Sequence, residues 1–308
     1  MSYFAPPQDI PTTVFTRLPD RFRKPVRTAW ADANRGGEAI HSFLEGPSFD
    51  RAGNLWVTDI PHGRIFRIST QGEWTLVSEY DGWPNGLKIA RDGTIFITDY
   101  RNGLMRLDPA TGRVEEVLGH IRSEGFKGLN DLVIARNGDI YFTDQGQTGM
   151  QDPTGRVYRL AADGRLECLI ATGPSPNGIV LDRAERHLYV AMTRAGQVWR
   201  MAVTRDAGVS KANVFAQIPA GIAGPDGLAM DEEDALAICD PGRGSVWVVD
   251  RLGEPRWRIR SCAGLATTNL AYGGADRRSL FITESASGSV LRAEMRVAGR
   301  AMVSHDEA

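Results

Sequence analysis

Short runs in which apolar and polar residues alternate recur along most of the chain, and glycine-containing turns separate them. Three of the clearest runs, Asn54–Asp59, Thr94–Asp99 and Asp139–Asp144, are apolar segments that end in a threonine and an aspartate. Alternation with a period of two between turn residues is typical of β-strands that bury one face. The pattern therefore predicts an all-β fold built from many short antiparallel strands.

Each repeat opens with a short phrase led by a polar residue. The leading residues lie 40, 45, 47, 49 and 43 positions apart along the sequence. They are Glu45, Asn85, Asn130, Asn177, Asp226 and Asn269. A period of this length, filled by short strands, is typical of a β-propeller. We therefore predict a six-bladed β-propeller with four-stranded antiparallel blades, in which the leading residues converge on the central axis.

The repeats divide the chain into three parts of one propeller domain, residues 1–308. Residues 1–40 form an extension without the repeat, residues 41–295 carry the six repeats, and residues 296–308 form a polar tail. The sixth repeat has room for only two or three strands, so we predict that the β-branched and aromatic segment Thr12–Leu18 completes it and closes the ring. The tail from Ala298 onward is expected to fray.

Antiparallel pairing places the leading residues on the same rim as the loops that join the second and third strands of each repeat. The loop at Gln145–Gly155 is the longest of these and is a candidate lid. The side chains proposed to contact a substrate are Asn85, Asn269, His62, Arg101, Arg194 and Arg243.

Composition excludes several classes of function. The chain has 308 residues, 42% hydrophobic and 24% charged, with a net charge of −2. A charge this close to neutral gives no basis for a nucleic-acid or membrane partner. Three cysteines without a C-x-x-C spacing, and a start without a signal-peptide pattern, favour a cytoplasmic protein without disulfides. The oligomeric state is left open.

The leading residues are all oxygen donors, two carboxylates and four amides. Such hard ligands suit Ca²⁺, Mg²⁺ or Mn²⁺ rather than zinc or copper, with Ca²⁺ as first choice. The identity of the metal is left open between Ca²⁺, Mg²⁺, Mn²⁺ and Zn²⁺. Asn-Gly and Asp-Gly pairs are also common turn signals, so a single copy would fit an ordinary turn. Six copies in one register on a closed ring favour one central divalent cation.

Four of the phrases resemble the metal-site motifs of a known family. They are Glu45-Gly46-Pro47, Leu129-Asn130-Asp131, Ser175-Pro176-Asn177-Gly178 and Pro225-Asp226-Gly227-Leu228. In this order, over roughly residues 43–293, they are similar to the senescence marker protein/gluconolactonase/luciferin-regenerating-enzyme-like family. The resemblance implies one divalent cation in the channel, held by Glu45, Asn130, Asn177 and Asp226. Asn85 and Asn269 lie outside that four-residue pattern.

Members of this family mostly hydrolyse lactones of sugar acids. The resemblance therefore implies a metal-dependent lactonase whose partner is a small lactone, an aldonic acid lactone such as gluconolactone. Asp226 is the catalytic candidate, either as a general base on water or as a nucleophile. Two alternatives stay open, an organophosphate or aryl ester hydrolase on the same metal site and a non-catalytic ligand-binding propeller.

Two further expectations concern other acids of the repeats. Asp131 directly follows Asn130, and strand alternation sends it away from the channel, toward a neighbouring blade. The aspartates at the end of the second strand recur in most repeats, which favours a structural task such as binding loop backbone N–H groups. These residues are Asp59, Asp99, Asp144 and Asp240.

Overall fold

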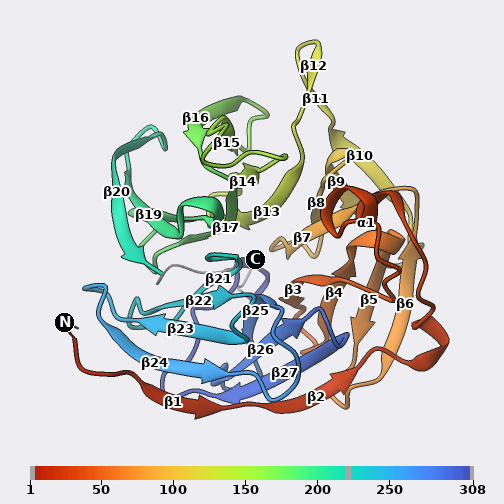
Figure 1. The fold of residues 1–308 in the computed structure, drawn as a ribbon. Helices are drawn as coiled ribbons and strands as arrows, with labels where there is room; N and C mark the ends of the chain where they lie inside the picture. Colours follow the sequence, from red (N-terminus) through yellow and green to blue (C-terminus); the bar gives the residue numbers. More distant parts are fainter. Residues whose placement is uncertain (1–3, 219–222, 306–308) are drawn as a thin grey trace.

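The computed structural model describes residues 4–218 and 223–305. Over these ranges the strands form six antiparallel blades arranged around a central channel (Figure 1). The prediction of a six-bladed β-propeller is therefore confirmed. The only α-helix in the described ranges is α1 (Ala29–Asn34), which lies over blade one.

In each of the first three blades the strands follow one another from the channel outward. Blade one contains β3 (Leu44–Phe49), β4 (Leu55–Asp59), β5 (Arg64–Ile68) and β6 (Trp74–Glu79). Blade two contains β7 (Pro84–Ile89), β8 (Ile95–Asp99), β9 (Gly103–Leu107) and β10 (Val114–Leu118). A small hairpin of β11 (His120–Ile121) and β12 (Glu124–Gly125) precedes blade three. Blade three contains β13 (Leu129–Ile134), β14 (Ile140–Asp144), β15 (Gly155–Leu160) and β16 (Leu166–Gly173).

The last three blades repeat this order. Blade four contains β17 (Pro176–Leu181), β18 (His187–Met192), β19 (Gln197–Val203) and β20 (Val209–Gln217). Blade five contains β21 (Leu228–Met230), β22 (Leu236–Asp240), β23 (Ser245–Val249) and β24 (Pro255–Arg260). Blade six contains β25 (Thr267–Gly273), β26 (Ser279–Glu284) and β27 (Ser289–Glu294) from the end of the chain.

The N-terminal segment closes the ring. β2 (Thr13–Arg17) pairs antiparallel with β27 and becomes the outer strand of blade six, as the sequence predicted. A second N-terminal strand, β1 (Gln8–Pro11), pairs parallel with β24 of blade five. This strand was not predicted, because a four-residue segment that ends in proline carries little strand signal. Together the two strands cover the outer edges of both blades and tie them to each other (Figure 1).

The hydrophobic core lies between the blades. Each of six clusters combines side chains of two neighbouring blades, as where Leu44 and Phe66 of blade one pack with Phe281 of blade six. Because strands alternate their side chains, each blade presents one apolar face to each neighbour. A seventh cluster holds α1 on blade one, where Trp30 packs against Ile60 and Phe43.

The C-terminal segment, residues 298–305, runs across one end of the channel. The Arg300 N–H donates to the Met230 carbonyl at 2.9 Å, and its Nη1 donates to the Leu181 carbonyl at 2.9 Å. Farther along, the Ser304 hydroxyl donates to the Phe49 carbonyl at 3.2 Å. We call this segment the C-terminal strap. The expectation that the tail frays from Ala298 was wrong for residues 298–305, because backbone groups of several blades pair with it.

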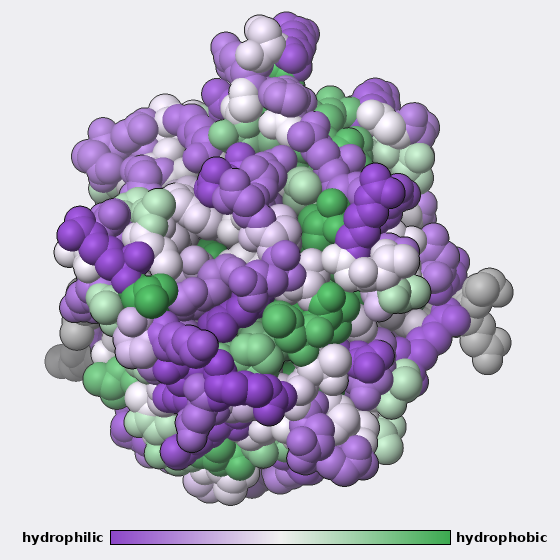
Figure 2. All heavy atoms as spheres, turned by 90° about the vertical axis from the view of Figure 1, so that its right-hand side faces the viewer, coloured by the Kyte–Doolittle hydropathy of each residue, from purple (hydrophilic) through white to green (hydrophobic). Residues whose placement is uncertain are grey.

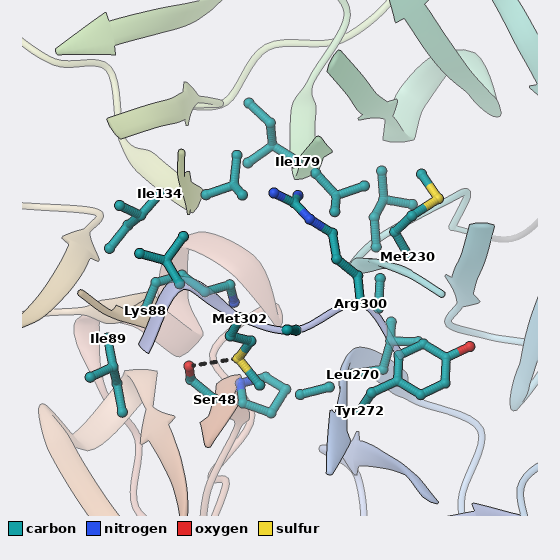
Figure 3. Close-up of a pocket in the computed structure, with 18 residues that line it drawn as sticks. Ser48, Lys88, Ile89, Ile134, Ile179, Met230, Leu270, Tyr272, Arg300 and Met302 are labelled. Carbon is teal, nitrogen blue, oxygen red and sulfur yellow. Dashed lines mark hydrogen bonds between the residues drawn. The ribbon is translucent and has the colours of Figure 1, made fainter. Parts of the chain in front are cut away.

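The strap encloses a small apolar cavity of about 90 Å³ at this end of the channel. Figure 3 shows Met302 above Ser48, with Ile134, Ile179 and Leu270 around the space. The strap therefore closes this end of the channel and leaves the opposite rim as the approach for a ligand.

The outer side of the ring over β5, β6 and β10 is mostly hydrophilic, with scattered hydrophobic spots (Figure 2). No helix in the described ranges is long and apolar enough to span a membrane.

Removal of the strap tests its structural role. Deletion of residues 299–308 should lower the melting temperature by several degrees, because it removes buried Val303 from its cluster with Ile134 and leaves the Met230, Leu181 and Phe49 carbonyls without their partners. Thermal unfolding followed by circular dichroism measures the change. An Arg296→Ala variant of the full chain serves as the control, and an unchanged melting temperature in the deletion variant would contradict the assignment.

Candidate active site

The innermost strand of most blades carries a β-bulge at the position of its leading polar residue. The pairing register shifts between Glu45 and Ser48 in blade one, between Pro84 and Leu87 in blade two, and between Leu129 and Leu132 in blade three. The same shift recurs in β17 and β25. A bulge interrupts the alternation of side chains, so two consecutive residues face the channel instead of one.

In several blades the residue directly after the leading residue is a glycine, at a place where the next blade approaches closely. A Cβ on Gly46 would lie 2.4 Å from the Asn85 carbonyl oxygen, and one on Gly178 would lie 2.3 Å from the Asp226 carbonyl oxygen. A Cβ on Gly227 would lie 2.3 Å from the Asn269 side chain. Where a glycine follows the leading residue, it therefore serves close contact between blades and does not mark a turn.

Threonine hydroxyls connect three of these strands, β7, β13 and β17, to the blade before each. Thr58 donates to the Asn85 carbonyl at 2.6 Å, Thr98 to the Asn130 carbonyl at 2.6 Å, and Thr143 to the Asn177 carbonyl at 2.8 Å. The backbone of a leading residue is thus held by the second strand of the preceding blade, which fixes where its side chain enters the channel.

Five of the six leading residues line one cavity on the open rim. They are Glu45, Asn85, Asn130, Asn177 and Asp226. This space, which we call the upper cavity, measures about 510 Å³ and lies within the usual size range of small-molecule sites. Glu45 is buried at its floor, whereas Asp226 is partly exposed to it.

The sixth leading residue is Thr268, not Asn269. The Asn269 N–H donates to the Thr283 hydroxyl at 3.0 Å, as the Asp131 N–H does to the Thr143 hydroxyl. Asn269 therefore corresponds to Asp131, and Thr268 takes the leading position and lines the upper cavity. The predicted register was wrong by one residue in this blade, because no glycine follows the leading residue to mark it.

Asp131 and Asn269 contact each other in a layer of the channel beneath the leading residues, which we call the lower level. The Asn269 Nδ2 donates to Glu45 Oε2 at 2.8 Å and to Asp131 Oδ2 at 3.3 Å. The expectation that Asp131 points away from the channel was wrong, because the bulge in β13 turns both Asn130 and Asp131 inward. Lys88 Nζ lies 4.0 Å from Asp131 Oδ1 and contributes the positive charge at this level.

Three of the four second-strand aspartates bind loop backbone N–H groups, the structural task that was predicted. Asp59 Oδ1 accepts the Phe43 N–H at 2.7 Å, and Asp144 Oδ1 accepts the Gly128 N–H at 2.8 Å. Asp99 Oδ1 likewise accepts the N–H groups of Arg101 and Asn102. Asp240 differs, because its Oδ2 accepts the Trp247 indole N–H at 2.9 Å.

Asn130 is oriented by its neighbour Gln145. The Asn130 Nδ2 donates to Gln145 Oε1 at 2.9 Å, and Gln145 Nε2 donates to the Ser175 hydroxyl at 3.1 Å. With its amide nitrogen engaged in this way, Asn130 has its carbonyl oxygen left for a ligand in the cavity.

Burial, together with neighbouring negative charge, raises the pKa of Glu45 and of Asp226. Burial raises the pKa of the Glu45 carboxyl to about 7, against hydrogen bonds from Gly46 and Asn269. Burial and the charges of Glu45 and Asp131 raise the pKa of Asp226 well above its ordinary value. A cation between these groups would favour their ionised forms. Within the described ranges no three His, Cys, Asp or Glu side chains are grouped to hold a metal, so the fit depends on the amides as well.

The remaining predicted contacts divide into two groups. Arg194 lines the upper cavity. His62, Arg101 and Arg243 lie outside its lining, where Arg101 pairs with Asp81 at 2.7 Å and Arg243 lies 3.5 Å from Asp240. His62 lies in η2 (Ile60–His62), and burial lowers its pKa.

Three residues of the N-terminal extension line the upper cavity and were missed by sequence reasoning. They are Trp30, Asn34 and Arg35, in and just after α1. The Gln147 amide joins this helix to the rest of the rim, since it lies 3.3 Å from Asn34 Oδ1 and 3.1 Å from the Tyr100 hydroxyl. No repeat relates α1 to the blades, so only its packing on blade one reveals its place.

Comparison with known proteins agrees with this architecture. Residues 43–286 match the family model described as the SMP-30/Gluconolactonase/LRE-like region. The chain belongs to this family. The lactonase drp35 of Staphylococcus epidermidis is 31% identical over 227 residues, which cover 70% of this chain and 69% of that protein. The family resemblance inferred from the four motifs is thereby confirmed.

Solved structures of the SMP-30/gluconolactonase/LRE-like family share the fold. The calcium-binding protein regucalcin of Agrobacterium tumefaciens superposes with a TM-score of 0.76 at 22% identity, over 96% of this chain and 98% of that one. A gluconolactonase of Xanthomonas campestris superposes with a TM-score of 0.72 at 24% identity, over 82% of this chain and 86% of that one.

The close approach at Gly178 can be tested by adding one methyl group. Gly178→Ala should lower the stability by about 1–3 kcal/mol, because the new Cβ would meet the backbone that carries Asp226. Urea unfolding monitored by tryptophan fluorescence measures the change. Gly125→Ala is the matched control, since no atom lies within 4 Å of its Cβ position. Equal effects of the two substitutions would contradict the role given to Gly178.

Proposed function

We propose that this protein is a divalent-metal-dependent hydrolase that opens a lactone of a sugar acid, an aldonic lactone such as gluconolactone. The observation that carries the proposal is the convergence of Glu45, Asn130, Asn177 and Asp226 on the floor of the upper cavity. The lactonase and gluconolactonase among its relatives support lactone hydrolysis as the reaction class.

The same four residues would hold the cation. Two carboxylates and two amide oxygens are a donor set for a hard cation, with Ca²⁺ as first choice and Mg²⁺, Mn²⁺ or Zn²⁺ as alternatives. The raised pKa values of Glu45 and Asp226 support this fit, because a bound cation would offset the repulsion between the two groups. When bound, a divalent cation polarises the lactone carbonyl and stabilises the negative charge that develops on its oxygen.

Asp226 is the residue that would activate the nucleophile. Its carboxylate is partly exposed to the cavity, where it would either take a proton from the attacking water or itself attack the carbonyl carbon. When water attacks, cleavage of the ring C–O bond leaves a hydroxyl and a carboxylic acid on the opened sugar acid. When Asp226 attacks, the same cleavage leaves a hydroxyl and an acyl group on the Asp226 carboxylate, and water then hydrolyses this anhydride to the sugar acid and free Asp226. Glu45 has a holding role, since its Oε2 already accepts hydrogen bonds from Gly46 and Asn269.

Substitution of Asp226 tests the catalytic assignment. Asp226→Asn should lower kcat for gluconolactone by about 10²–10⁴-fold, because the amide can neither take a proton nor attack the carbonyl. Release of acid in a pH-indicator assay measures turnover. Asp81→Asn, which neutralises an exposed rim carboxylate, should keep the wild-type rate. Wild-type turnover in Asp226→Asn, with an unchanged fold, would contradict the proposal.

Metal dependence can be tested by both activity and stability. Chelation should abolish turnover, and Ca²⁺ at a hundred times its dissociation constant should stabilise the fold by about 2.7 kcal/mol. Differential scanning calorimetry with each candidate cation measures the second effect. The stabilisation should be lost in Glu45→Gln, which removes one of the two ligand charges. A chelated protein that keeps full activity would exclude the metal-dependent mechanism.

The reaction class is tested separately with a substrate panel. Aldonic lactones should be hydrolysed faster than phosphotriesters and aryl esters, and the reverse order would favour the organophosphate or aryl ester hydrolase. Turnover of no compound in the panel would favour a non-catalytic binding propeller.

A further inference from the structure

Two arginine side chains line the mouth of the upper cavity from opposite sides of the ring. Arg35 follows α1 above blade one, and Arg194 lies in η3 (Thr193–Ala195) of blade four. Within the described ranges neither guanidinium has an ion-pair partner. Among the described residues of the lining, Glu45 and Asp226 are the only other charged side chains.

The backbone of each arginine is held firmly. The Thr193 N–H donates to the Ser175 carbonyl at 3.0 Å, and its hydroxyl donates to the Pro225 carbonyl at 2.7 Å, which fixes η3 between blades four and five. The Arg35 N–H donates to the Ala31 carbonyl at 2.8 Å, and its guanidinium lies 5.8 Å from the centre of the Phe43 ring. Both side chains thus extend from anchored positions.

Two buried arginines of the blades are already neutralised. Arg64 pairs with Asp59, and Arg159 pairs with Asp139 at 2.7 Å. On the same rim, Arg101 pairs with Asp81 at 2.7 Å. The two cavity arginines differ from these because their charge is available to a ligand.

The charges in the cavity do not balance for a neutral substrate. A divalent cation would neutralise Glu45 and Asp226, and the two arginines would then leave a net positive charge at the mouth. Guanidinium groups bind carboxylates through paired hydrogen bonds, which neutral hydroxyl groups cannot fully replace.

The geometry points to a lactone that carries a carboxylate as the preferred substrate of this site, with Arg194 and Arg35 as the residues that select it. The inference rests on the proposed lactonase function and, among lactones of sugar acids, moves the preferred substrate from aldonic lactones to lactones of sugar diacids. The carboxylate binds at the mouth of the cavity while the lactone carbonyl faces Asp226 on the floor.

Two matched substrates test this inference. The 1,4-lactone of D-gluconic acid and the 1,4-lactone of D-glucaric acid have the same ring. They differ only at the far end of the side chain, which is a hydroxymethyl group in the first and a carboxylate in the second. The wild-type protein should prefer the carboxylated lactone at least tenfold in kcat/KM. In Arg194→Met this ratio should fall at least tenfold, mainly through KM, and in Arg35→Met by a smaller factor. Added salt should lower the wild-type ratio as well.

The control is Arg106→Met, which removes the same charge from an ion pair with Glu115 outside the cavity lining. It should keep the wild-type ratio. A wild-type preference for the neutral lactone, or an equal loss on both substrates in Arg194→Met, would overturn the inference while leaving lactone hydrolysis intact. Hydrolysis of neither lactone would instead contradict the proposed function itself.

Discussion

The architecture depends on how closely the six innermost strands approach one another around the axis. Gly46, Gly178 and Gly227 stand where the next blade's inner strand would collide with any side chain. The β-bulges beside Gly46 and Gly178 turn the leading residues into the channel. A ring with wider spacing could not bring carboxylates and amides from different blades to one point, so close packing of the backbone is the condition for the site.

Close approach also concentrates charge. Glu45, Asp131 and Asp226 come from blades one, three and five, and their mutual repulsion would be costly without compensation. The protein supplies part of that compensation itself, through the Asn269 amide between Glu45 and Asp131 and through Lys88 beneath Asp131. The remainder would be supplied by a bound cation at the level of the leading residues. The lower level is therefore a permanent part of the fold, whereas the upper level is free to bind a ligand.

The two chain ends, which lie outside the repeat, make the two ends of the channel different from each other. The C-terminal strap closes one end with backbone hydrogen bonds to several blades, so a ligand approaches from the other rim. On that rim, α1 of the N-terminal extension supplies Trp30, Asn34 and Arg35 to the cavity. The repeats build a symmetric channel, and the extensions make its two ends chemically different.

The sequence alone was enough to predict the number of blades, closure of the ring by the N-terminal strand, and convergence of five leading residues. These features follow from repetition along the chain, with a period of two within strands and of 40 to 49 residues between blades, which the order of residues displays directly. The inward turn of Asp131, the replacement of Asn269 by Thr268 at the leading position, and the place of α1 and the strap were decided only by tertiary structure. A bulge shifts side chains between the faces of a strand without leaving a reliable mark in the sequence, and segments without a repeat have no internal copy that indicates where they dock.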